Sequence, residues 1–126
     1  MQTSYFAKAK NLYPTSVSIA LQTPEWFTGK RYTALNPTPF ILSFKDRPKE
    51  FEKYYRDLIL KRLNPFTVYK DLGANSILLC WEKAGKFCHR RIVASWLEKE
   101  LDIVIPEKEY VQVIPMKQVN LFEEEE

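Results

Sequence analysis

The chain has 126 residues, a length that fits one domain of ordinary size. Its composition, 45% hydrophobic and 28% charged, excludes a disordered or fibrous protein. No apolar run is long enough to span a membrane, and the N-terminus lacks the apolar stretch of a secretory signal. We therefore expect a cytoplasmic protein without a membrane partner, whose two cysteines are reduced thiols rather than a disulfide framework.

The charge is unevenly distributed along the chain. Nineteen lysines and arginines against 16 acidic residues give a net charge of +3, and four of the acidic residues form the terminal run Glu123–Glu126. We expect a single domain over residues 1–118 and an acidic tail over residues 119–126. A basic body suits an anionic ligand, although simple solubility explains the same balance.

The N-terminal third favours short strands. Residues 2–6 are aromatic and β-prone, and residues 7–12 can form a helical turn. Residues 16–21 alternate between polar and apolar with a period of two, which is typical of a strand. Prolines and a glycine predict a loop over residues 22–39.

The middle of the chain favours helices. We expect a short helix over residues 39–45 and an amphipathic helix over residues 48–63, with Pro48 at a permissive first position. A third helix is predicted between Asn64, a typical N-cap residue, and Gly73, a plausible stop. Its expected apolar face consists of Phe66, Tyr69 and Leu72.

The clearest strand spans residues 76–81, a continuous apolar run of the kind that is buried inside parallel sheets. Apolar residues then recur with helical spacing over residues 88–101, and further short strands are expected over residues 102–105 and 110–114. Helices that alternate with apolar strands predict a single α/β domain in three layers with a mostly parallel sheet.

The connection between this strand and the following helix is the candidate site. Ligands of open α/β sheets bind at the carboxyl ends of strands, and a helix N-terminus attracts anions. Basic residues gather here, although the helix dipole disfavours cations in the first turn. Because a bound anion would offset these charges, we expect an anion site. The alternative is that the cations pair with Glu82 or another carboxylate, or are solvated. The basic residues are Lys83, Lys86, Arg90 and Arg91.

Two cysteines flank the same connection, Cys80 at the strand end and Cys88 at the helix start. A thiol at a helix N-terminus near arginine has a lowered pKa, and its thiolate can act as a nucleophile. The alternative is that both cysteines pack as small apolar residues. With His89 they supply only three candidate metal ligands, two of them adjacent and without a CxxC pair, so the sequence predicts no metal site.

His89 is the only histidine of the chain and is a candidate general acid or base. The sequence contains no GxSxG, no Walker loop and no GxGxxG, which excludes an ordinary nucleotide-binding loop, and we expect no cofactor. Aromatic and basic residues interleave in the N-terminal third, a mix that can stack bases and neutralise phosphates but also serves packing. We include Tyr5 and Lys8 as candidate substrate contacts.

The central motif resembles a known family. The run LLCWE at Leu78–Glu82, followed by FCHR at Phe87–Arg90 and a helix that continues to Trp96, is similar to the signature of the family called domain of unknown function 488. The start of the chain is also similar to these proteins, so the resemblance extends to about Pro115. The N-terminal stretches that carry it are Thr3–Phe6, Val17–Ile19 and Tyr32–Pro37.

The family is grouped by analogy with the rhodanese and cysteine-phosphatase superfamily, so the resemblance implies a Rossmann-like parallel sheet. It also implies that Cys80 is the counterpart of the catalytic cysteine and that Arg90 holds an oxyanion. Its family context suggests roles around nucleotides or nucleic acids.

The first functional hypothesis is a cysteine-dependent enzyme that acts on an anionic substrate, a nucleotide or nucleic acid. Cys80 would be the nucleophile and Arg90 would stabilise negative charge. His89 or Glu82 would transfer protons, and Cys88 would resolve an oxidised or persulfidated Cys80. The alternatives are a non-catalytic module that binds phosphate groups and an interaction factor that docks through its acidic tail.

Overall fold

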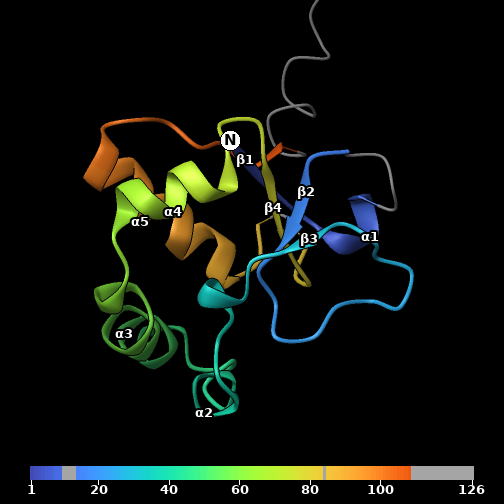
Figure 1. The fold of residues 1–126 in the computed structure, drawn as a ribbon. Helices are drawn as coiled ribbons and strands as arrows, with labels where there is room; N and C mark the ends of the chain where they lie inside the picture. Colours follow the sequence, from blue (N-terminus) through green and yellow to red (C-terminus); the bar gives the residue numbers. More distant parts are fainter. Residues whose placement is uncertain (10–13, 84, 109–126) are drawn as a thin grey trace, which may run out of the picture.

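The computed structural model describes residues 1–9, 14–83 and 85–108 (Figure 1). Within this part, four parallel strands form one sheet in the order β1–β4–β2–β3. The α/β class with a parallel sheet, predicted from the sequence, is confirmed. The strands are β1 (Gln2–Tyr5), β2 (Ser16–Ser18), β3 (Lys30–Arg31) and β4 (Ile77–Cys80).

Helices follow β1, β3 and β4, whereas a loop without a helix connects β2 to β3. The α-helices are α1 (Phe6–Ala9), α2 (Pro39–Leu42), α3 (Pro48–Leu58), α4 (Pro65–Leu72) and α5 (His89–Leu101), and the 3-10 helices are η1 (Thr33–Leu35) and η2 (Leu60–Arg62). Among the described residues, no helix has the length and apolar character that crossing a bilayer requires.

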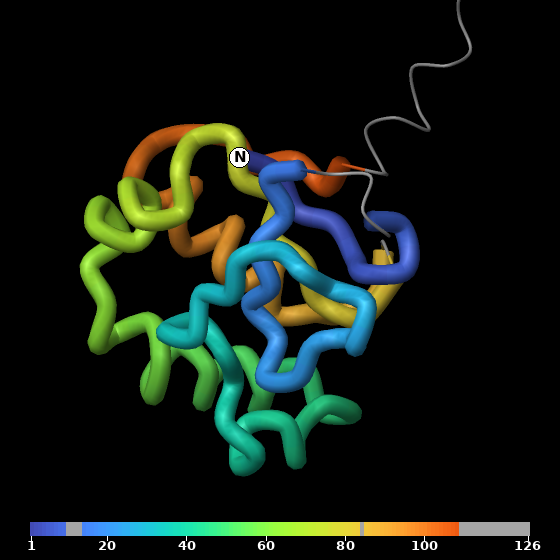
Figure 2. Tube along the Cα trace, turned by 45° about the vertical axis from the view of Figure 1, so that its right-hand side comes forward, coloured from blue at the N-terminus to red at the C-terminus, as the bar shows by residue number. Residues whose placement is uncertain are grey.

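The central strand β4 is buried on both faces, as its apolar run predicts. Leu78 enters a large core, whereas Ile77 and Leu79 enter a smaller core that contains Phe6 and Phe27. Helices α3, α4 and α5 lie on one side of the sheet and α1 lies on the other (Figures 1 and 2). The second covering layer is therefore thin, a single helical turn together with the loop that follows β2.

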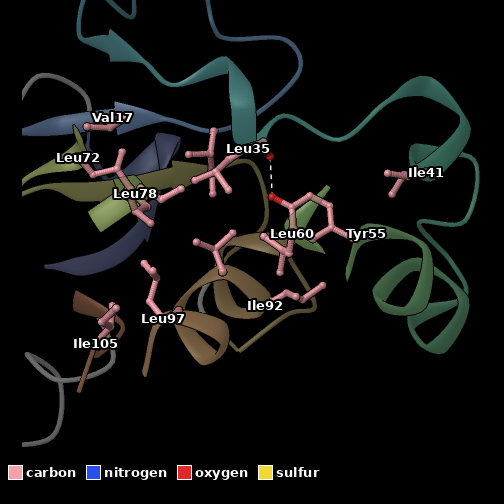
Figure 3. Packing of buried hydrophobic residues seen from close by; sticks show 14 of the residues in the cluster. Val17, Leu35, Ile41, Tyr55, Leu60, Leu72, Leu78, Ile92, Leu97 and Ile105 are labelled. Carbon is pink, nitrogen blue, oxygen red and sulfur yellow. Dashed lines mark hydrogen bonds between the residues drawn. The ribbon is translucent and has the colours of Figure 1, made fainter. Parts of the chain in front are cut away.

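The large core fixes α5 against the sheet (Figure 3). Leu97 of α5 and Leu78 of β4 are fully buried within it. Tyr55 of α3 is also fully buried, and its hydroxyl donates a hydrogen bond of 2.6 Å to the carbonyl oxygen of Leu35. Because interiors are close-packed, this core holds the N-terminus of α5 at a defined distance from the end of β4.

The N-terminus of α4 is capped as the sequence predicts. The side-chain oxygen of Asn64 accepts hydrogen bonds from the backbone N–H groups of Phe66 and Thr67, at 2.9 and 3.2 Å. At the other end of the helix, Gly73 adopts a positive φ of 92°. The two local signals therefore mark both ends of this helix correctly.

Replacing Asn64 by alanine removes both cap hydrogen bonds, so we expect Asn64→Ala to lower the free energy of unfolding by about 1 kcal/mol. Urea unfolding followed by circular dichroism measures the change. Asn64→Ser keeps an acceptor oxygen at the cap and should retain most of the stability. An equal loss in the two variants would show that the acceptor oxygen at residue 64 does not stabilise the helix.

The strand predicted over residues 102–105 is wrong. Asp102 takes a left-handed conformation with φ of 56°, and the backbone N–H of Ile105 is bonded to the carboxylate of Glu98 rather than to a strand. An isolated bridge between Thr3 and Glu107 takes the place of a ladder. The strand predicted over 110–114 and the acidic tail lie outside the described residues.

Four further predictions need correction. The helix predicted over residues 48–63 divides into α3 and η2, and the alternating strand over 16–21 ends at Ser18. The loop over 22–39 contains β3 and η1. Phe66, assigned to the buried face of α4, is 66% exposed, because Val68 and Leu72 form the face that packs against the core.

Candidate functional site

A pocket of about 880 Å³ opens beyond the carboxyl ends of β2 and β4, the place where parallel sheets bind ligands. Cys80, Cys88 and His89 line it together, from the end of β4 and the start of α5. Much of the remaining wall is apolar and comes from the segment that follows β2, from α2 and its flanks, and from α3. These apolar residues include Leu21, Pro37, Pro39, Leu42 and Phe51.

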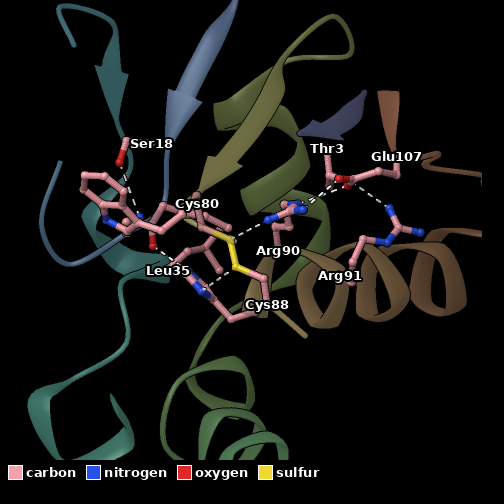
Figure 4. Close-up of a disulfide and its surroundings, with 12 residues drawn as sticks. Thr3, Ser18, Leu35, Cys80, Cys88, Arg90, Arg91 and Glu107 are labelled. Atoms are coloured by element: carbon pink, nitrogen blue, oxygen red, sulfur yellow. Dashed lines mark hydrogen bonds and ion pairs between the residues drawn. A yellow bond between two sulfur atoms is a disulfide. The ribbon is translucent and has the colours of Figure 1, made fainter. Parts of the chain in front are cut away.

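The sulfur atoms of Cys80 and Cys88 are joined as a disulfide (Figure 4). Cys80 is only 1% exposed, whereas Cys88, the N-cap residue of α5, is 7% exposed. The structure therefore differs from the reduced thiols expected from the sequence. The reason lies in the fold, because the turn that follows β4 reverses the chain and brings Cys88 back to the strand end.

Arg90 approaches the sulfur pair from the protein interior (Figure 4). Its side chain is fully buried, and Nη1 donates a hydrogen bond of 3.1 Å to Sγ of Cys80. Nε and Nη2 donate to the two carboxylate oxygens of Glu107, at 3.1 and 2.7 Å. The ring of Tyr5 lies 5.8 Å from Cζ of Arg90. The guanidinium group is thus committed to internal partners.

Glu107 is the residue of this network that sequence reasoning missed. Although burial by itself raises its pKa, hydrogen bonds from Arg90 and Thr3 and the charges of Arg90 and Arg91 hold the pKa of Glu107 below its ordinary value. The carboxylate therefore stays charged beside the buried guanidinium group. A buried arginine needs such a partner, but no sequence pattern says which carboxylate supplies it.

Arg91 is also bonded internally. Its Nη1 donates to the hydroxyl oxygen of Thr3 at 2.8 Å and to the carbonyl oxygen of Ile105 at 2.9 Å. Neither Arg90 nor Arg91 lines this pocket, whereas Arg91 lines a second, smaller pocket of about 270 Å³ together with Arg56 and Lys86. The alternative that the sequence offered, pairing with a carboxylate, describes Arg90, with Glu107 rather than Glu82 as the partner.

His89 is held by a single strong contact. Its Nε2 lies 2.7 Å from the carbonyl oxygen of Ile19, and because a carbonyl only accepts, Nε2 carries the hydrogen. The pKa of His89 is lowered to about 4, mainly by burial. The hydrogen bond to Ile19 raises this pKa, and the charge of Arg90 lowers it further. The ring is therefore neutral at pH 7, and the lone pair of Nδ1 is directed to Sγ of Cys88, 3.9 Å away.

The pocket wall carries equal numbers of acidic and basic side chains. Glu82 and Lys86, two of the predicted site residues, line it together with Lys45 and Asp46, which sequence reasoning missed. The remaining predicted contacts lie elsewhere, since Tyr5 packs beside Arg90 while Lys8 and Lys83 are outside the pocket lining. The structure thus gathers the cysteines and His89 and disperses most of the predicted basic cluster.

Trp81 is a pocket residue that the sequence placed in the strand without a role. Its indole N–H donates a hydrogen bond of 2.9 Å to the carbonyl oxygen of Gln22, and its ring packs edge-on against Phe6 at 5.0 Å. The indole is 52% exposed. An aromatic surface therefore stands at the pocket beside the sulfur pair.

Fold and site together define an α/β protein with a parallel sheet and a cysteine pair at its carboxyl edge, backed by one buried arginine and one neutral histidine. Comparison of the chain with protein-family models, with curated proteins and with solved structures found no match. The resemblance to domain of unknown function 488 therefore stays a prediction, and the site is interpreted from its own geometry.

Proposed function

We propose that the protein is a thiol-dependent oxidoreductase that uses Cys80 and Cys88 as a redox pair. The observation that carries the proposal is the joining of the two sulfur atoms at the wall of a pocket of about 880 Å³. Pockets of this size take small molecules, and an exchangeable disulfide needs a route for its partner.

The reaction is a two-step thiol–disulfide exchange. In the first step, one thiolate attacks a sulfur atom of a substrate disulfide, forms a mixed disulfide and releases the first substrate thiolate. In the second step, the other cysteine attacks the mixed disulfide, which releases the second thiolate and leaves the Cys80–Cys88 bond. The protein loses two electrons and the substrate gains them. A small thiol reductant, as in the cytoplasm that we expect for this chain, then restores the dithiol.

Cys88 is the attacking residue in this proposal. It is more exposed than Cys80, it stands at the N-terminus of α5, and its sulfur lies 3.9 Å from Nδ1 of His89. Cys80 is the resolving residue, because Nη1 of Arg90 stabilises negative charge on its sulfur. These roles reverse the first hypothesis from the sequence, in which Cys80 attacks and Cys88 resolves.

The wall of the pocket suggests the kind of substrate. Apolar side chains and the exposed indole of Trp81 favour a substrate with an apolar or aromatic part. An anionic group on that substrate, as the sequence predicts, has Lys45 and Lys86 as the cationic partners at the wall. A substrate disulfide that carries a nucleotide would use these two lysines in place of the buried arginines.

An anionic aromatic disulfide, 5,5′-dithiobis(2-nitrobenzoate), tests the proposal on the full chain after reduction and removal of metals with a chelator. We expect the wild type to release two thiolates per chain and to keep no adduct, because the second cysteine resolves the first. Cys80→Ser should release one thiolate and keep the adduct on Cys88. Cys88→Ser should react about tenfold or more slowly, because its remaining thiol is the less accessible one. Absorbance and intact mass measure both quantities.

The same measurements can contradict the proposal in two ways. An adduct that persists on both cysteines of the wild type would mean that the pair does not close, and the proposed function would be wrong. A stable adduct in Cys88→Ser with none in Cys80→Ser would assign the attack to Cys80 and contradict the roles given above.

A further inference from the structure

Three atoms that can bind a metal ion meet at the wall of the pocket. The sulfur atoms of Cys80 and Cys88 and a ring nitrogen of His89 all lie within 4.8 Å of one another, and all three side chains are buried. Zinc bonds of about 2.3 Å to sulfur and 2.0 Å to nitrogen separate tetrahedral ligand atoms by roughly 3.5 to 4 Å. After reduction breaks the bond between the two sulfur atoms, these atoms must move apart to reach such separations, and the three donors can then surround the ion.

The orientation of His89 is the one that a metal ligand needs. A metal-bound histidine almost always donates its other ring N–H to a carbonyl or carboxylate oxygen, which fixes the ring. Here Nε2 donates to the carbonyl oxygen of Ile19 at 2.7 Å, and this contact leaves Nδ1 as the donor atom that faces the sulfur of Cys88. The outer contact is thus already in place.

The backbone spacing of the two cysteines also suits separated sulfur atoms. Their Cα atoms are 7.1 Å apart, just beyond the span of about 4.4 to 6.8 Å that protein disulfides usually have. Two sulfur ligands of one tetrahedral ion lie farther apart than two bonded sulfur atoms, so they suit a wider separation of the Cα atoms. The frame formed by the end of β4 and the start of α5 therefore accommodates the reduced pair as well as the joined one.

The charges around the cluster balance once a divalent ion is present. Two thiolates offset the charge of a divalent cation, and the buried guanidinium group of Arg90 is offset by Glu107. Nη1 of Arg90 donates to the sulfur of Cys80 and would act as an outer hydrogen bond to a ligating thiolate. Without the ion, two thiolates in this buried setting would repel each other.

We infer that the reduced protein binds one zinc ion through Cys80, Cys88 and Nδ1 of His89. Three protein ligands leave one of four positions open, and because all three residues line the pocket, a water molecule or a substrate atom can take it. Zinc and the disulfide exclude each other, since the sulfur atoms must be reduced to bind the ion. This inference does not depend on the proposed oxidoreductase activity.

The sequence predicts no metal site because it has no CxxC pair and two of its three candidate ligands are adjacent. The three ligand atoms come close together only in the folded chain, where the turn after β4 places the start of α5 beside the end of β4. The signal available in the sequence is the adjacency of Cys88 and His89, and this signal is weak by itself.

Cobalt and zinc titrations of the reduced full chain test the inference. We expect one cobalt ion per chain, with thiolate-to-cobalt charge-transfer absorption in the near ultraviolet and the ligand-field bands of a tetrahedral site, and we expect zinc to displace it. The chain oxidised with diamide is the matched control and should bind neither metal. A reduced wild type without these bands and without zinc affinity would overturn the inference.

Variants assign the ligands. Cys80→Ser, Cys88→Ser and His89→Gln should each weaken zinc binding by about 100-fold or more, which exceeds the tenfold to 100-fold loss typical of an outer-shell change. Asp46→Asn, which alters a pocket carboxylate outside the donor cluster, should bind zinc like the wild type. Undiminished binding in Cys88→Ser would place the ion elsewhere and refute the assignment.

A measurement on the wild type guards against variants that do not fold. Because the chain has a single histidine, the two ring-nitrogen resonances of His89 are unambiguous in a nitrogen-15 spectrum. On zinc addition to the reduced chain, Nδ1 should take a coordinated shift while Nε2 stays protonated. Coordination through Nε2 would break the contact with Ile19 and contradict the geometry. The thiol-exchange experiment is run without metal, so either result can fail while the other holds.

Discussion

Arg90→Met should lower the free energy of unfolding by roughly 3 kcal/mol or more, because it removes one partner of a buried ion pair and leaves the other. Arg90 is fully buried and the side chain of Glu107 is only 10% exposed, so water cannot easily take over the lost contacts. The variant also deprives the sulfur of Cys80 of a donor. Urea unfolding at pH 7 measures the loss, with the disulfide kept intact.

The double variant Arg90→Met with Glu107→Gln is the matched control. Replacing the stranded carboxylate by a neutral amide should recover a large part of the stability, because an uncompensated buried charge is the main penalty. A double variant that loses the sum of the two single losses would show that the residues act independently, and the ion pair would then not account for the burial of Arg90.

Lowering the pH from 7 to 5 should reduce the free energy of unfolding by roughly 2 kcal/mol through His89 alone. The pKa of His89 is 6.5 without the fold and about 4 in the folded chain, chiefly because of burial. The unfolded chain therefore binds a proton in this window while the folded chain does not. The contribution of neutral His89 to the free energy of unfolding is fully present above pH 6.5 and is lost as the pH falls toward 4.

Urea unfolding of the oxidised, metal-free chain at several pH values measures how the free energy of unfolding depends on pH. His89→Gln should make this dependence weaker between pH 7 and 5. Glu107 affects stability only at a lower pH, because its pKa in the folded chain lies below the ordinary 4.5. Its contribution to the free energy of unfolding is lost as the pH falls below 4.5. An unchanged slope in His89→Gln would mean that His89 titrates normally in the folded chain.

Local patterns account for the parts of the fold that the sequence predicts. The apolar run of β4 and the helical spacing of α5 are visible because burial of a strand on two faces and of a helix on one face leaves a periodic trace. The cap at Asn64 and the stop at Gly73 mark α4 through backbone chemistry that depends on a few neighbouring residues. The location of the site at the strand end follows from the same two elements.

Contacts between distant segments account for most of what the sequence does not predict. Arg90 lies in a basic run that suggests an anion site, yet its partner Glu107 is 17 residues away in a segment beyond α5. His89 is oriented by a backbone carbonyl 70 residues earlier, a group that every residue possesses and no motif encodes. The roles of these two side chains therefore depend on the folded arrangement rather than on residue spacing.

The hydrogen bonds of Arg90 couple the sulfur chemistry to a remote part of the backbone. One end of the guanidinium group contacts Cys80, the other end holds Glu107, and the backbone N–H of Thr3 donates to the neighbouring carbonyl of Pro106. After reduction, a thiolate on Cys80 would compete with Glu107 for the same cation. The redox state of Cys80 would then affect how tightly the segment after α5 is held to the edge strand β1.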